Sequence, residues 1–94
     1  MIILLTKQTD LTLDTDYLII NNPVKLIDDY HLEYDNHVLE FDYLIVEDNS
    51  FIISENLDFV KDGNLIITNW VGQTSIEHIY IGNFDKAIDD LLNN

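Results

Sequence analysis

Eighteen Asp and Glu residues face four lysines and no arginine in this 94-residue chain, which gives a net charge of −14. An anionic surface of this size repels phosphate backbones and anionic lipids, so direct binding to nucleic acid or to membranes is not expected. Apolar residues make up 47% of the chain, and we therefore expect residues 1–94 to fold as a single domain rather than remain disordered.

The chain contains no cysteine, which excludes disulfides, thiolate nucleophiles and cysteine-ligated metals. This composition fits a reducing cytoplasm, and we expect a cytoplasmic protein. Residues 1–5 form an apolar run without a basic flank or a cleavage site. The run is too short for a signal peptide or a membrane span, and it predicts the first strand of the fold.

β-branched and aromatic residues dominate the rest of the chain and alanine occurs only once, which favours strands. Turn-forming residues separate these strands. The expected strands cover residues 2–6, 16–20, 24–27, 30–34, 37–41, 43–46, 51–54, 64–68 and 77–81. Three continuous apolar runs, at 16–20, 42–46 and 64–68, indicate strands that are buried on both faces.

The clearest local feature is a hairpin around Asp35 and Asn36, which both tolerate positive φ in a two-residue turn. This turn places apolar side chains on one face of the hairpin and polar side chains on the other. The expected pairs are Tyr34 with His37, Glu33 with Val38, Leu32 with Leu39, His31 with Glu40 and Tyr30 with Phe41.

A helix is expected at the end of the chain, with Asn83 as its N-cap. Its apolar residues recur at helical spacing and form one stripe that must dock on a sheet. The members of this stripe are Phe84, Ala87, Ile88, Leu91 and Leu92. The sequence thus predicts an α+β fold that is mostly β: a meander of hairpins, a buried central strand and one C-terminal helix packed on the sheet.

Residues that could carry chemistry do not form a recognisable site. His31, Glu33, Asp35 and His37 alternate, but the expected turn moves His37 to the opposite face, so no metal site is predicted. The three glycines are nine and ten residues apart, which excludes the glycine-rich loops that bind phosphates. We expect no catalytic residue, no metal and no cofactor, and we expect Trp70 to be a core or sheet-edge aromatic.

Residues 38–88 nevertheless resemble part of the thioredoxin-reductase-like pyridine nucleotide-disulfide oxidoreductases. Residues 38–46 (Val-Leu-Glu-Phe-Asp-Tyr-Leu-Ile-Val) are similar to the strand that returns from the nicotinamide domain to the flavin domain, and residues 57–67 to an acidic-Gly turn followed by a strand. Residues 73–83 are similar to the family motif Thr-Ser-(Val/Ile)-Pro-Gly-(Ile/Val)-(Tyr/Phe)-Ala-Ala-Gly-Asp. The resemblance implies that Gly82 and Asn83 stand where the family contacts its flavin.

The departures from the family pattern are large. Glu77-His78 replaces the Pro-Gly pair, Tyr80-Ile81 replaces the small Ala-Ala pair, and Asn83 replaces the flavin-contacting Asp. Both nucleotide fingerprints and the redox cysteine pair are missing. The resemblance therefore implies a degenerate remnant of a flavoprotein scaffold without its chemistry.

The sequence predicts a non-enzymatic acidic interaction protein whose partner is a protein, with a basic one favoured by charge. The sequence also allows self-association into a homo-oligomer through unpaired sheet edges. One alternative is an acidic mimic of nucleic acid that inhibits a DNA- or RNA-binding enzyme. A further alternative is a flavin-binding accessory subunit whose site is completed by another chain.

Overall fold

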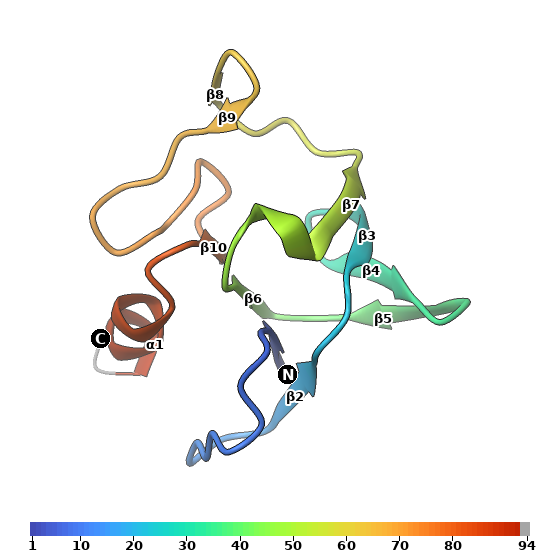
Figure 1. The fold of residues 1–94 in the computed structure, drawn as a ribbon, viewed down its shortest axis with the longest axis vertical. Coiled ribbons are helices and arrows are strands. Elements are labelled where there is room, and N and C mark those ends of the chain that lie inside the picture. Colours follow the sequence, from blue (N-terminus) through green and yellow to red (C-terminus); the bar gives the residue numbers. More distant parts are fainter. Residues whose placement is uncertain (93–94) are drawn as a thin grey trace.

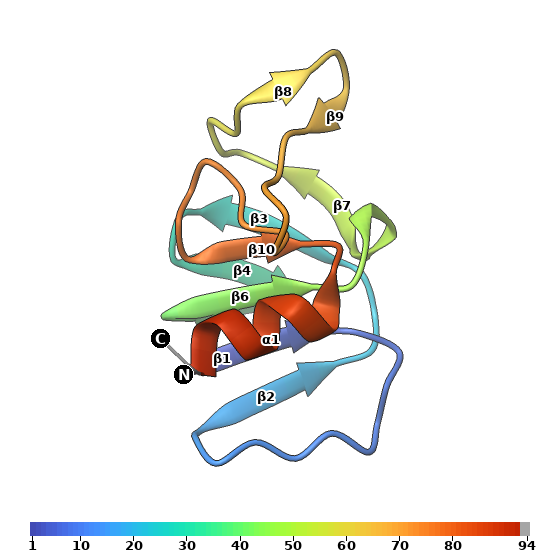
Figure 2. The ribbon, with the colours of Figure 1, turned by 90° about the vertical axis from the view of Figure 1, so that its left-hand side faces the viewer.

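The computed structural model describes residues 1–92 and stacks them in three layers (Figure 1 and Figure 2). A four-stranded parallel sheet forms the middle layer. A second four-stranded sheet packs on one of its faces, and helix α1 (Phe84–Leu92) covers the other. Strands make up 40% and helices 13% of the chain, which confirms the expected α+β, mostly β class with a C-terminal helix.

The middle sheet has the strand order β10-β6-β1-β2. It is built from β1 (Ile2–Leu5), β2 (Tyr17–Ile20), β6 (Tyr43–Val46) and β10 (Ile79–Ile81). Because side chains alternate across a strand, Ile3 and Leu5 pack toward the second sheet, whereas Ile2 and Leu4 pack toward α1. Leu11 and Leu13, from the irregular segment that joins β1 to β2, complete the cluster on the helix side.

The second sheet has the order β5-β4-β3-β7. Its strands are β3 (Val24–Asp28), β4 (His31–Tyr34), β5 (His37–Glu40) and β7 (Ile52–Glu55), with the short 3-10 helix η1 (Asn49–Phe51) before β7. The predicted hairpin is confirmed: Asp35 and Asn36 have φ of 52° and 62°, and the pairs from His31–Glu40 to Tyr34–His37 have the expected register. The Phe41 amide also bonds to the Tyr30 carbonyl, at 2.9 Å.

The continuous apolar run at 42–46 is confirmed as a buried strand, since Leu44, Ile45 and Val46 of β6 are fully buried. The run at 16–20 differs from the prediction: β2 is one of the two edge strands of the middle sheet, and its Leu18 is exposed. An edge strand has a neighbour on one side only, so its outer residues remain accessible to solvent.

The prediction of a doubly buried strand at 64–68 is wrong. Only Leu65–Ile66 is a strand (β9), and it pairs with Lys61–Asp62 (β8) in a two-stranded ribbon. Figure 2 shows this ribbon at one end of the molecule, beyond the two larger sheets. Only one side of the ribbon faces the rest of the protein. Leu65 lies on the other side and is 61% exposed.

Truncation of two leucines should distinguish the buried strand from the exposed ribbon. Leu44→Ala opens a cavity beside β1 and should lower the free energy of unfolding by about 2–5 kcal/mol. Leu65→Ala removes the same atoms from an exposed site and should change it by less than about 1 kcal/mol. Urea unfolding followed by circular dichroism measures both; equal losses would contradict the exposed position of Leu65.

Candidate functional site

The two residues that the flavoprotein resemblance singles out lie at the carboxyl end of β10, just before α1. The Gly82 amide donates a hydrogen bond to the Val46 carbonyl at 2.9 Å. The Asn83 side-chain amide donates to the Trp70 carbonyl at 3.0 Å. Asn83 is therefore not the expected side-chain cap: its backbone carbonyl accepts from the Ala87 amide, while its side chain ties down the loop at 69–73.

The loop at 69–73 is held closely against this end of β10. The Asn69 side-chain oxygen accepts hydrogen bonds from the amides of Val71 (3.1 Å) and Gln73 (2.9 Å). The Gly72 carbonyl accepts from the Ile81 amide at 2.8 Å. Gly72 has a φ of 87°, and a Cβ there would lie 2.7 Å from the Gly82 carbonyl oxygen, so only glycine fits this approach.

Between β1 and β6 the same edge is bridged by side chains of the chain itself. The buried Thr6 hydroxyl donates to a Glu47 carboxylate oxygen at 2.6 Å, and the Asn21 side-chain amide donates to the Thr6 carbonyl at 2.7 Å. Open parallel sheets bind ligands at the carboxyl edge, where the strand order reverses, and here that point lies between β1 and β6. Thr6, Glu47 and Asn21 therefore hydrogen-bond to one another at this edge.

A methyl group at Gly72 tests how closely the loop packs on β10. Gly72→Ala combines a left-handed backbone with a steric clash and should destabilise the fold by about 2–3 kcal/mol. Gly63→Ala, the matched control, has a φ of 63° and open space around its Cβ, so it should cost about 1 kcal/mol. Thermal or urea unfolding compares the two, and a smaller loss for Gly72→Ala would contradict this packing.

Trp70 is at the tip of this loop and is 75% exposed. The prediction of a core or sheet-edge aromatic is therefore wrong. The physical reason is local: Val71, the next residue, occupies the buried position against α1, and the tight turn around Asn69 directs its neighbour outward. The Lys86 ammonium lies 5.9 Å from the centre of the Trp70 ring, in cation–π range.

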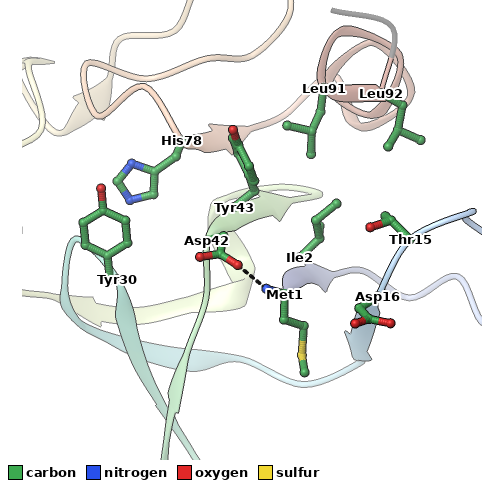
Figure 3. Close-up of a pocket in the computed structure, with 10 residues that line it drawn as sticks. All are labelled: Met1, Ile2, Thr15, Asp16, Tyr30, Asp42, Tyr43, His78, Leu91 and Leu92. Carbon is green, nitrogen blue, oxygen red and sulfur yellow. Dashed lines mark hydrogen bonds and ion pairs between the residues drawn. The ribbon is translucent and has the colours of Figure 1, made fainter.

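The opposite, amino-terminal edge of the middle sheet contains a cleft of about 670 Å³. Figure 3 shows how residues that precede or begin the strands meet there, with the end of α1 above them. Its lining is Met1, Ile2, Thr15, Asp16, Tyr30, Asp42, Tyr43, His78, Leu91 and Leu92. The cleft therefore combines carboxylates, aromatic rings and an apolar wall.

Aromatic stacking organises one wall of this cleft. The rings of Tyr30 and His78 lie nearly parallel, 8° apart in orientation, with centroids separated by 4.3 Å. A His78 ring nitrogen also contacts the Asp29 carbonyl oxygen. On the facing wall, an Asp42 carboxylate oxygen accepts a hydrogen bond from the N-terminal ammonium of Met1. Sequence reasoning missed this group, because Tyr30 and His78 belong to distant segments.

A smaller hollow of about 390 Å³ shares Tyr30, Tyr43, His78 and Leu91 with the cleft. In its wall, the Tyr80 hydroxyl donates a hydrogen bond to an Asp90 carboxylate oxygen at 2.9 Å. Burial, followed by this hydrogen bond and the negative charge of Asp90, raises the pKa of Tyr80 to about 12. The hydroxyl therefore stays protonated at neutral pH and holds α1 against β10.

The raised pKa of Tyr80 gives the stability of the fold a defined alkaline dependence. Unfolded chains release this proton near pH 10.0, whereas the folded chain holds it to about pH 12. The stabilisation is complete below pH 10 and should be lost, by roughly 2 kcal/mol, as the pH rises toward 12. Tyr80→Phe should remove this part of the alkaline loss in urea unfolding from pH 9 to 12. Identical slopes for the two proteins would contradict the assignment.

The alternating His31–His37 segment is divided between separate interactions. A His31 ring nitrogen lies 2.8 Å from an Asp28 carboxylate oxygen, and the other lies 3.6 Å from Glu40. Hydrogen bonds from the Tyr30 amide and the His31 ring lower the pKa of Asp28. A His37 ring nitrogen instead lies 2.7 Å from the Asp35 carbonyl oxygen. Within residues 1–92, no three His, Asp or Glu side chains converge as metal ligands.

The acidic side chains of the chain lie at its surface. None of the 18 Asp and Glu residues is buried: 14 are exposed and Glu33, Glu47, Glu55 and Asp90 are half-buried. Lys61 forms an ion pair with Glu55 at 2.7 Å. The exposed carboxylates occur on the loop at 7–16, on the second sheet, on the β8–β9 ribbon, on α1 and in the turns that join these elements.

Neither known family models, nor curated proteins, nor solved structures match this chain. Within the part of the chain that the structure describes, every helix is too short or too polar to cross a membrane.

Proposed function

We propose that this chain is a non-enzymatic acidic protein of the cytoplasm that binds a basic protein partner. The observation that carries the proposal is the cleft at the amino edge of the middle sheet, where carboxylates and aromatic rings line one cavity of about 670 Å³. A cavity with this lining favours a cation over an anion or a neutral group.

An arginine or lysine side chain has the chemistry that this lining recognises. Asp16 offers a carboxylate for charge-assisted hydrogen bonds, and Asp42, which already accepts from the N-terminal ammonium, adds a second exposed carboxylate to the lining. Tyr43 and the half-exposed Tyr30 offer rings on which a guanidinium can stack, and Leu91 offers apolar surface for the aliphatic stem. The net charge of −14 extends the attraction beyond the cleft and accelerates the approach of a basic partner.

We further propose that the chain is a remnant of a thioredoxin-reductase-like flavoprotein. Support comes from the position of Gly82 and Asn83 at the carboxyl end of a parallel strand, directly before a helix. The loss of flavin binding is supported by the hydrogen bond that commits the Asn83 side chain to Trp70. The distribution of carboxylates over the loop at 7–16, the second sheet, the ribbon and α1 favours a basic protein as the target over mimicry of a nucleic acid, which requires a phosphate-like row on one face.

The proposal predicts that removing charge inside the cleft weakens cation binding more than removing it elsewhere. Asp16→Asn combined with Asp42→Asn should weaken the affinity for an acetylated tetra-arginine peptide about tenfold, because two negative charges are lost from the lining of the cleft. The control, Asp35→Asn combined with Asp10→Asn, removes two charges at exposed positions outside the cleft and should change it less than about threefold. Isothermal titration calorimetry at 50 and 200 mM salt measures both.

Equal losses in the two double variants would show that the cleft is not the binding site. An affinity for tetra-arginine that is no greater than that for tetra-glutamate would overturn the basic-partner proposal itself. Stoichiometric flavin absorbance in the purified protein would contradict the non-enzymatic proposal and favour the accessory-subunit alternative.

A further inference from the structure

One side of the β8–β9 ribbon presents apolar side chains to solvent. In an antiparallel ribbon, directly paired residues point to the same side. Asp62 pairs with Leu65, and Val60 follows the same register because its carbonyl accepts from the Ile67 amide at 3.0 Å. Val60, Leu65 and Ile67 therefore share one side, and they are 55%, 61% and 47% exposed. We call these three residues the ribbon surface.

The other side of the ribbon is anchored to the protein. Ile66 packs against the core between the two large sheets, and Lys61 forms its ion pair with Glu55 at the end of β7. The ribbon surface is thus the outward side of a fixed element. Residues 64–68 have the apolar composition of a buried strand, yet Leu65 and Ile67 face solvent.

Exposed apolar residues are concentrated in this part of the chain. Of the eleven large exposed apolar residues within residues 1–92, five fall between residues 53 and 70. Trp70 is three residues beyond Ile67, so their Cα atoms are within roughly 11 Å of one another. Clustered apolar residues on a fixed scaffold mark interaction surfaces, and tryptophan is the residue most enriched among the anchors of such interfaces.

We propose that the ribbon surface, with Trp70 three residues beyond it in the chain, docks an apolar segment of a protein partner whose flanks carry lysine or arginine. Charge selects this occupant over a second copy of the chain. Asp58 and Asp62 are exposed on either side of Val60, and two copies would each bring a net charge of −14 to the interface. A basic flank is instead attracted to these carboxylates. The inference rests on the proposed function and adds a second, apolar contact to the cleft.

The test uses the full chain and three labelled peptides of equal length: an apolar core with lysine flanks, the same core with glutamate flanks, and a Gly-Ser core with lysine flanks. Fluorescence anisotropy should show the tightest binding for the first peptide. Because Trp70 is the only tryptophan, its emission should shift to shorter wavelength when that peptide covers it. Leu65→Ser should weaken the binding about tenfold.

Val38→Ser is the matched control, since Val38 is also 61% exposed but lies on β5; it should change the affinity less than about twofold. Ile67→Ser is a second variant of the same surface and should act like Leu65→Ser. Equal binding by Leu65→Ser, Ile67→Ser and the unmodified chain would overturn the ribbon surface while leaving the proposed cation binding intact. Equal affinity for the glutamate-flanked peptide would overturn the basic flank.

A concentration-dependent dimer that Leu65→Ser abolishes, measured by analytical ultracentrifugation, would assign the surface to a second copy and overturn the inference. Failure of every lysine-flanked peptide and of tetra-arginine to bind would instead overturn the proposed function itself.

Discussion

The burial of β1 on both faces is the constraint on which the rest of the structure depends. Every residue of this strand is buried, and Ile3, Leu4 and Leu5 have no exposed surface. A parallel sheet requires cover on both sides, which crossover helices usually supply. This chain has a single α-helix within residues 1–92, so the second sheet covers one side and α1, aided by the irregular segment at 6–16, covers the other.

With both faces of the middle sheet covered, only its edges and the outer layers are left for binding. The two ends of the parallel strands then become chemically different. At the carboxyl end, Thr6, Glu47 and Asn83 bond to other residues of the chain and close the place where parallel sheets usually bind ligands. At the amino end, the strands begin at carboxylates and aromatic rings that remain accessible in the cleft. The polar and aromatic groups that a ligand could reach therefore lie at the amino end of the sheet rather than at its carboxyl end.

Local features of this arrangement could be predicted from the sequence. The Asp35-Asn36 turn fixed the register of the β4–β5 hairpin because its geometry depends on two residues alone. The apolar stripe of the C-terminal helix is similarly local: Phe84 and Ala87 are buried, and Ile88 and Leu91 pack on the same cluster, but the predicted fifth member, Leu92, is 44% exposed in the last turn. The continuous run of β6 correctly indicated burial on both faces.

The long-range features could not be predicted in this way. The parallel pairing of Leu4 with Ile45 joins strands 41 positions apart, and the stacking of Tyr30 on His78 spans 48 positions. The runs in β6 and at 64–68 have similar compositions. Only β6 is buried, because it pairs with β1 and β10 in the middle of the parallel sheet, and composition does not encode that pairing. Asn83 was placed correctly before the helix, but the partner of its side chain depends on how the loop at 69–73 folds back.

The exposed ribbon surface and the acidic charge are physically coupled. A fixed apolar surface beside an exposed tryptophan favours self-association in a protein of low net charge. Here two approaching copies repel one another through a net charge of −14 each, and that repulsion reaches about 10 Å at 0.1 M salt but only about 3 Å at 1 M. We propose that the carboxylates keep this apolar surface, which the core does not use, from pairing with a second copy. A partner of opposite charge meets attraction at the same surface where another copy of the chain meets a barrier.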